Sequence, residues 1–250
     1  MGLTLRHKFI RRWTRIKTRL AYSWEKARAC WCGGSLGPSR SPLVGECLEC
    51  GTGVLRWRLM EGSYNRWYAS GDYRRSQMGT ADVTAAQLAK EIRRAEAALR
   101  FLSDHAFDVY DKSVLDVGCG AGGALLVARL LRARFLLGVD SDPRSKTIPA
   151  TFGIQVIDSL PAMDTWNRVI CSHLIEHVLR PVEFLRALGL YLSPTGCLYV
   201  ETPAWGPKAE VKLPHPFMYT EQSFQLLAKR AGLTIVAMTD GIQAILRRAA

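Results

Sequence analysis

Residues 114–124, VLDVGCGAGGA, constrain the fold of this chain more than any other segment. A run of apolar residues typical of a buried strand leads into a turn that contains Gly118, Gly120, Gly122 and Gly123, and a helical stretch follows. Glycine adopts positive φ angles and lets a ligand approach the bare backbone. Strand, glycine turn and helix in this order predict an α/β protein that binds a nucleotide or nucleoside where the strand ends.

Short apolar segments alternate with helical ones through residues 81–250. Strands are predicted at 112–117, 134–139, 153–157, 167–171, 196–201, 233–239 and 242–248, and helices near 122–133, 144–150, 174–190 and 220–231. A further long helix is expected after Asp82, which could cap it. The alternation predicts a doubly wound, mostly parallel, seven-stranded sheet covered by helices on both faces. Asp240-Gly241 is a tight hairpin signal, so the last strand is expected to be antiparallel.

Residues 29–80 differ from the rest of the chain in being rich in Gly, Pro, Ser and Cys. Four of the seven cysteines lie here in the pattern C-x-C-x14-C-x2-C, and they are Cys30, Cys32, Cys47 and Cys50. Each pair precedes a glycine, which favours a four-thiolate structural zinc site, with metal-free buried thiols as the alternative. Such a site would hold together a module too small for its own core, and it fits a reducing cytoplasm. The aromatic segment that follows, WYASGDYRRSQMG, is expected to cross the mouth of the adjoining domain.

Residues 1–28 contribute +8 of the formal net charge of +12, because nine Lys and Arg residues face the single acid Glu25. Apolar residues recur there at helical spacing, and they are Leu5, Phe9, Trp13, Ile16 and Leu20. A basic amphipathic helix of this kind could bind an anionic membrane surface peripherally at its inner face, or it could pack on its own body or on a second copy. The remaining residues are nearly neutral, so a nucleic-acid-binding face is not expected.

Three acidic residues follow or end successive predicted strands: Asp116, Asp140 in GVDSDP, and Asp158 in VIDSL. An acid at the end of the second strand can accept hydrogen bonds from both hydroxyls of a ribose. The glycines alone also fit the dinucleotide pattern G-x-G-x-x-G. Asp116, however, would repel a pyrophosphate and would suit a ligand with an ammonium group, such as S-adenosylmethionine. Each acid could instead be a turn-former or a helix cap.

These motifs resemble those of the class I S-adenosylmethionine-dependent methyltransferases over residues 81–250, with VLDVGCGAGG, GVDSDP, VIDSL, RVICSHLIEHVLRPVEFLRAL, GCLYVETP and PHPFMYTEQSFQLLAKRAGL in the family's order. Asn167 departs from the Asp common there. The resemblance implies a Rossmann-like domain in which Asp116 and the backbone of Gly118, Gly120 and Gly122 hold the methionine moiety. It also implies that Asp140 holds the ribose and Asp158 the adenine amino group. With its Cys-rich lead-in, the chain is also similar to bacterial methyltransferases of sugars and small metabolites.

Methyl transfer requires alignment of the acceptor with the methyl carbon and the sulfur, and often a base for the acceptor's proton. His173, Glu176 and His177 in SHLIEHV are candidate bases, since their spacing places them on one side of a helical turn. His215 lies between two prolines, in a loop expected over the pocket. His177 could instead be a packed or capping histidine. The segment could also supply divalent-metal ligands, as a matching segment does in some quinone-pathway O-methyltransferases, where an acid replaces His173.

The sequence thus predicts a methyltransferase acting on a small-molecule, glycan or lipid-linked acceptor, at oxygen by preference. An RNA or protein methyltransferase that docks through the basic N-terminus and the Cys module is the alternative. A cofactor-binding protein without catalysis is a third interpretation.

Overall fold

The computed structural model describes residues 21–162, 165–207, 209–212 and 215–249. An amphipathic helix was predicted within residues 1–28, of which residues 1–20 lie outside the described part of the chain. The described residues 21–28 include a short strand, β1 (Trp24–Lys26). Among the described residues, none of the helices combines the length and the apolar character that crossing a membrane would require.

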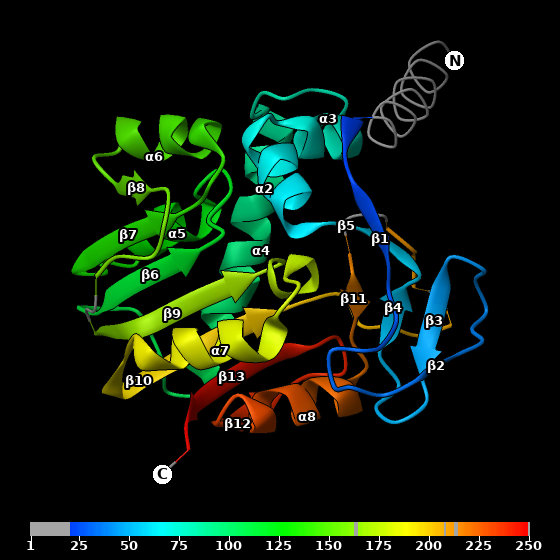
Figure 1. Cartoon of the computed structure of the whole chain (residues 1–250). Coiled ribbons are helices and arrows are strands. Elements are labelled where there is room, and N and C mark those ends of the chain that lie inside the picture. The colour runs from blue at the N-terminus through cyan, green and yellow to red at the C-terminus, as the bar shows by residue number, and fades with distance from the viewer. Residues whose placement is uncertain (1–20, 163–164, 208, 213–214, 250) are drawn as a thin grey trace.

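A seven-stranded sheet forms the centre of the molecule, in the order β12-β13-β10-β9-β6-β7-β8 (Figure 1). Its strands are β6 (Ser113–Val117), β7 (Phe135–Val139), β8 (Gln155–Ile157), β9 (Trp166–Ser172), β10 (Leu192–Glu201), β12 (Leu233–Met238) and β13 (Gln243–Arg248). The pairs from β8 through β10 are parallel, whereas β13 is antiparallel to both of its neighbours. The predicted doubly wound sheet with an antiparallel last strand is therefore confirmed.

Helices cover both faces of the sheet, because successive strand residues point to opposite sides. The main ones are α4 (Ala85–Asp104), α5 (Gly123–Leu130), α6 (Thr147–Thr151), α7 (Pro181–Leu190) and α8 (Glu221–Arg230). On one face Val114 of β6 packs with Leu99 of α4. On the other face the neighbouring Leu115 belongs to the same core cluster as Leu185 of α7 and Phe224 of α8.

Two predicted helix boundaries were wrong. The long helix α4 is capped by Thr84, whose hydroxyl accepts a hydrogen bond from the Gln87 amide at 3.2 Å, and Asp82 lies outside it. The segment predicted as one helix at 174–190 is two elements, a 3-10 turn at Ile175–His177 and then α7. Pro181 at the first helical position disfavours a helical conformation for the residue before it, so the chain restarts there.

The Cys-rich segment forms a four-stranded antiparallel sheet in the order β11-β4-β3-β2. Its strands are β2 (Leu36–Gly37), β3 (Val44–Cys47), β4 (Gly53–Leu55) and β11 (Phe217–Met218). Because β11 comes from the region between β10 and α8, the module shares its sheet with the large domain. A separate two-stranded ribbon pairs β1 with β5 (Trp57–Leu59).

The segment expected to cross the mouth of the domain forms two short helices, α2 (Glu61–Ala69) and α3 (Asp72–Met78). They lie beyond the carboxyl ends of β6 and β9 (Figure 1). An aromatic cluster of Tyr64, Trp67, Tyr68 and Tyr73 joins them, with ring centroids 4.6 to 6.3 Å apart.

Candidate active site

A cavity of about 700 Å³ opens where β6, β7 and β9 end, beneath α2 and α3. Its volume is typical of sites for small molecules and cofactors. One part of its wall is the glycine turn with Asp116 and Asp140, and α4 contributes Glu91 and Arg94. The other part is aromatic and apolar, with Tyr64, Tyr68, Tyr73, Leu174, Val178 and Phe184.

The glycine turn has the conformation that its sequence demands. Gly118 and Gly120 have φ angles of 77° and 58°, a region that residues with a side chain rarely adopt. The Gly120 amide donates a hydrogen bond to the Asp140 carboxylate at 2.8 Å, which fixes the turn against the end of β7. At Gly123 an added Cβ would lie 2.7 Å from the Cβ of Glu91. The absence of a side chain at Gly123 therefore lets α4 approach the turn closely.

Three carboxylates, Glu91, Asp116 and Asp140, converge on the turn, and we call them the acidic triad. Asp116 is 4% exposed, and burial, followed by the negative charges of Glu91 and Asp140, raises its pKa to about 8. Burial also raises the pKa of Glu91 and of Asp140, although backbone amides donate hydrogen bonds to both. A bound cation would relieve this mutual repulsion. The amino group and sulfonium of S-adenosylmethionine supply positive charge, so the triad fits that cofactor.

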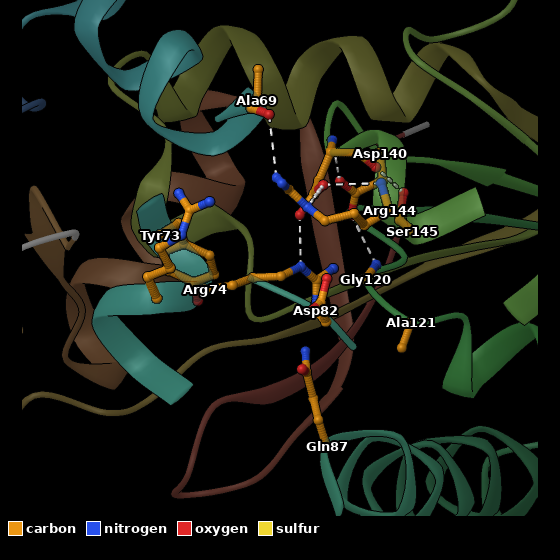
Figure 2. A network of polar contacts seen from close by, with 12 residues as sticks. Ala69, Tyr73, Arg74, Asp82, Gln87, Gly120, Ala121, Asp140, Arg144 and Ser145 are labelled. Atoms are coloured by element: carbon orange, nitrogen blue, oxygen red, sulfur yellow. Dashed lines mark hydrogen bonds and ion pairs between the residues drawn. The ribbon is translucent and has the colours of Figure 1, made fainter. Parts of the chain in front are cut away.

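Asp140 is held by the backbone on both of its oxygens. Oδ2 accepts from the Gly120 amide and Oδ1 from the Asp142 amide, each at 2.8 Å. Figure 2 shows Asp140 beside Gly120, with Arg74 and Arg144 nearby. Each carboxylate oxygen keeps a further lone pair, so the side chain is pre-oriented to accept the two hydroxyls of a ribose.

An ion pair fastens α3 over the cavity. Arg74 Nε lies 2.6 Å from Asp142 Oδ2, and both side chains are almost fully buried. Arg144 binds the other oxygen of Asp142 at 2.7 Å and also donates to the Ala69 carbonyl at the end of α2. Burial raises the pKa of Asp142, but the hydrogen bond from Arg74 outweighs it and leaves the pKa below its ordinary value.

The candidate bases gather at one place. Glu176 is 2% exposed, its Oε1 lies 3.3 Å from His173 Nδ1, and His173 Nε2 lies 3.5 Å from Glu201 Oε1. The rings of His177 and His215 meet edge to face with centroids 4.7 Å apart. His173 and His177 line the cavity. Of the two, His177 also contacts the rings of Tyr68 and Tyr73, at 5.7 and 5.5 Å.

The charges in this cluster are unequal. Burial opposes ionisation of Glu176, but the hydrogen bond with His173 and the neighbouring histidines lower its pKa to about 2. Burial, followed by the charge of His177, lowers the pKa of His215 to about 3, so this imidazole is neutral at pH 7. Burial opposes protonation of His173, but Glu176 and Glu201 outweigh it and raise its pKa. One ligand atom from each of Glu176, His177 and His215 lies within 4.8 Å of the others, which is also compatible with a divalent cation.

The four cysteines of the small module form a second, buried cluster. Cys30 Sγ lies 3.7 Å from Cys50 Sγ, and Cys32 Sγ lies 3.4 Å from Cys47 Sγ. Both separations are too long for a disulfide. Tetrahedral thiolates at about 2.3 Å from zinc would lie about 3.8 Å from one another, so the four sulfurs fit that ion.

A family described as "Methyltransferase domain" matches residues 86–238, which is more than half of the chain. The chain belongs to this methyltransferase family. Ubiquinone biosynthesis O-methyltransferase of Photobacterium profundum is 25% identical to it over 116 residues, 42% of this chain and 49% of that protein. The tRNA U34 carboxymethyltransferase of Colwellia psychrerythraea is 30% identical over 117 residues, 40% of this chain and 35% of that protein. The methyltransferase thus spans about half the length of the first of these relatives, and about a third of the second.

Solved structures share the fold. The 1,6-didemethyltoxoflavin-N1-methyltransferase of Burkholderia thailandensis, with bound S-adenosylhomocysteine, superposes with a TM-score of 0.59 at 14% identity, covering 86% of this chain and all of that one. The magnesium protoporphyrin IX methyltransferase of Synechocystis superposes with a TM-score of 0.54 at 13% identity, covering 76% of this chain and all of that one. At these identities the likeness shows the methyltransferase fold and nothing finer.

The cavity brings together most of the residues that the sequence singled out in this methyltransferase. Gly122, Glu176, His215 and Asp158 are not among its lining residues, and Glu176 and His215 are buried behind His177 instead. Asp158 does not line the cavity: its side chain is 67% exposed and pairs with Lys146 at 2.7 Å. The structure therefore places Asp158 outside the cavity wall, and its assignment to the adenine amino group stays a prediction. Asp158 follows the short edge strand β8, where its side chain turns outward to the lysine of the preceding 3-10 turn.

Sequence reasoning missed two residues of the methyltransferase cavity. Glu91 accepts a hydrogen bond from the Ala121 amide at 2.8 Å, and Arg74 holds α3 in place. In the sequence, Glu91 resembles the other surface acids of a charged helix. Only its spacing of three and four residues from the apolar Leu88 and Ala95 indicates that it lies on the buried face of that helix. Arg74 belongs to a segment with no strong pattern, and no sequence signal points to its partner Asp142.

Proposed function

We propose that this protein transfers a methyl group from S-adenosylmethionine to a small-molecule, glycan or lipid-linked acceptor, at an oxygen atom. The observation that supports this most directly is the shared cavity, whose walls hold both the acidic triad and the imidazoles of His173 and His177. When bound, the cofactor supplies an activated methyl group on a sulfonium, a leaving group that needs no acid. The residues of the chain then have three tasks: to bind the cofactor, to orient the acceptor and to remove its proton.

In this proposal the cofactor occupies the wall formed by the glycine turn. Asp116 and the backbone of Gly118, Gly120 and Gly122 hold the methionine moiety, and Asp140 holds the ribose. Glu91 supports the site by fixing the Ala121 amide and by adding negative charge beside Asp116.

The acceptor lies against the aromatic wall, where Tyr64, Tyr68 and Tyr73 offer ring faces and edges to a cyclic molecule. His177 is the best-placed base, because it lines the cavity between these rings and the buried His215. Glu176 is ionised and adjacent, so it stabilises the imidazolium that forms when His177 takes the acceptor's proton. His173, whose pKa is raised by Glu176 and Glu201, is a hydrogen-bond donor in this scheme.

The proposal extends to the rest of the chain. Cys30, Cys32, Cys47 and Cys50 hold a structural zinc ion that stabilises the small module. Residues 1–28 bind an anionic membrane surface, which suits a lipid-linked acceptor. Flotation with anionic liposomes, with and without residues 1–28, tests that step, and equal flotation of both proteins would contradict it.

RNA is a second candidate acceptor, favoured by one observation, the 30% identity over 117 residues to the tRNA U34 carboxymethyltransferase of Colwellia psychrerythraea. The near neutrality of residues 81–250 opposes it. Radiolabelled S-adenosylmethionine supplied with separate extracts of sugars, lipids, protein and RNA distinguishes the acceptors, because label moves only into the fraction that contains the substrate.

Calorimetry tests the cofactor assignment. Asp140→Ala is expected to weaken S-adenosylmethionine binding roughly tenfold or more, which corresponds to at least about 1.4 kcal/mol. Asp158→Ala is the matched control, since it removes a carboxylate after the adjacent strand that does not line the cavity. Equal affinity of Asp140→Ala and the unaltered protein would remove the ribose assignment, and weaker binding by Asp158→Ala would support the predicted contact between Asp158 and the adenine.

A further inference from the structure

A second hollow, of about 450 Å³, lies beside the cavity, between the Cys module and the helices α7 and α8. Leu179, Arg180 and Glu183 line both hollows, so the two are contiguous along this rim. The remaining walls of the second hollow come from Trp31 of the module, Arg186 of α7 and Arg230 of α8, with Pro181 and Val182. We call it the arginine groove.

Positive charge dominates the groove. Three guanidinium groups line it, those of Arg180, Arg186 and Arg230, against the single carboxylate of Glu183. In the part of the chain that the structure describes, neither Arg186 nor Arg230 forms an ion pair with an acid. Arg180 approaches Glu61 only at 3.8 Å, and both of those side chains are largely exposed. The groove therefore offers about two positive charges that the protein itself leaves uncompensated.

Two of the arginines are positioned by the backbone rather than by acids. Arg230 Nη1 donates to the Cys32 carbonyl at 2.8 Å, and Arg186 Nη2 donates to the Arg230 carbonyl at 2.8 Å. A carbonyl fixes a guanidinium without neutralising it, and each guanidinium has five N–H donors. Most of these donors remain available for a ligand that carries several acceptor oxygens.

The Cys module places an aromatic surface in the same groove. Trp31 stands between two clustered cysteines, its indole Nε1 donates to Thr52 Oγ1 at 3.0 Å, and the Arg230 guanidinium carbon lies 5.8 Å from its ring centroid. Trp31 and the Cys32 carbonyl are neighbours in the first cysteine pair, so the module places the aromatic ring and the carbonyl together beside Arg230. This arrangement gives the module a role at the substrate side of the molecule in addition to its own stability.

We propose that the arginine groove binds a phosphate or diphosphate group carried by the acceptor, while the acceptor's methyl-receiving part lies in the adjoining cavity. This inference rests on the proposed methyl transfer and narrows its substrate to phosphorylated molecules. Phosphate oxygens match the forked guanidinium geometry, and the shared rim lets one molecule occupy both hollows. Nucleotide-linked and lipid-linked acceptors contain the same group.

Calorimetry of the full-length protein with inorganic pyrophosphate tests the groove directly. The double variant Arg180→Gln/Arg186→Gln is expected to bind pyrophosphate roughly tenfold more weakly or worse, since it removes two of the three cations. Glu183→Gln is expected to bind more tightly, because it removes the only acid of the groove. Arg129→Gln, an exposed arginine on α5, is the matched control and is expected to leave the affinity unchanged.

The outcomes separate the groove from the catalytic proposal. Absence of pyrophosphate binding, or equal affinity in the double variant and the unaltered protein, would overturn the inference. S-adenosylmethionine affinity, measured in the same proteins, is expected to be unchanged, and a failure of the unaltered protein to bind it would refute the proposed function instead. Arginine-dependent binding of a nucleoside diphosphate indicates a nucleotide-linked acceptor. Arginine-dependent binding of phosphatidylcholine vesicles only when they contain phosphatidic acid indicates a lipid-linked one.

Discussion

Replacement of Asp116 by Asn is expected to stabilise the protein without its cofactor while abolishing cofactor binding. The Asp116 carboxyl is buried beside two other carboxylates, and its pKa rises from an ordinary 3.8 to about 8. At pH 7 the folded protein must therefore keep it protonated, whereas the unfolded chain ionises it. About three pH units separate neutral pH from 3.8, and at about 1.4 kcal/mol per unit the upper bound on the cost to folding is slightly more than 4 kcal/mol.

The pH dependence of this effect has a definite sign. Below pH 3.8 both states hold the proton and Asp116 costs nothing. Stability then falls as pH rises from 3.8 to about 8, because only the folded state still binds the proton, and above 8 the cost is constant. Asn has nearly the same shape and no charge, so the difference in free energy of unfolding between Asp116→Asn and the unaltered protein should grow across this window.

Urea denaturation at about pH 4, 6 and 8 measures the difference. The variant is expected to be the more stable protein by roughly one to a few kcal/mol at pH 8 and about equal at pH 4, while its S-adenosylmethionine affinity falls below detection. Asp158→Asn is the control, since its exposed carboxylate pairs with Lys146. A variant that is less stable at the highest pH, or a difference independent of pH, would refute the electrostatic account of the acidic triad.

Three further predictions concern other parts of the molecule. His177→Gln is expected to lower kcat by about 10² to 10⁴ with little change in cofactor affinity, whereas His105→Gln, on the exposed end of α4, leaves both unchanged; equal rates would exclude His177 as the base. Cys47→Ala is expected to remove bound zinc and lower Tm, as metal analysis and thermal unfolding would report, whereas Cys197→Ala, in the large sheet, should keep the metal. Arg74→Gln leaves Asp142 paired only with Arg144 and is expected to cost about 3 kcal/mol and to speed proteolysis within α2 and α3; an unchanged cleavage rate would contradict the fastening role of this ion pair.

The sheet could be predicted because its strands are short apolar runs separated by helical stretches, and this pattern indicates both the number of strands and their mostly parallel direction. The antiparallel last strand followed from Asp240-Gly241 alone. Helix boundaries were less certain because capping depends on one side chain, and Thr84 competes with Asp82 for the same helix. The helices α2 and α3 escaped prediction since packing of Tyr64 and Trp67, more than local propensity, stabilises them.

The positions of the acidic residues could be predicted only in part from the sequence. The strand-end rule placed Asp116 and Asp140 at the cavity, where the structure has them, whereas Asp158 lies outside the cavity wall. Side chains along a strand alternate between the two faces of the sheet. Asp158 follows a strand of only three residues at the sheet edge, so its direction depends on a single ion pair with Lys146. Glu91 was missed because its approach depends on Gly123, a residue far away in the chain.

The short segment 140–142 links the proposed cofactor site to the helices α2 and α3 above it. Asp140 accepts a hydrogen bond from the Asp142 amide, while the Asp142 side chain binds Arg74 of α3 and Arg144. A ligand that binds the Asp140 carboxylate therefore contacts the loop whose Asp142 side chain holds α3. Tyr73 of α3 lines the same cavity, on the wall proposed for the acceptor. Under the proposed function, cofactor binding is therefore expected to influence the position of Tyr73 through this short loop. Such an influence would give the nearly fully buried Arg74–Asp142 ion pair, which is costly in desolvation, a role beyond holding α3 in place.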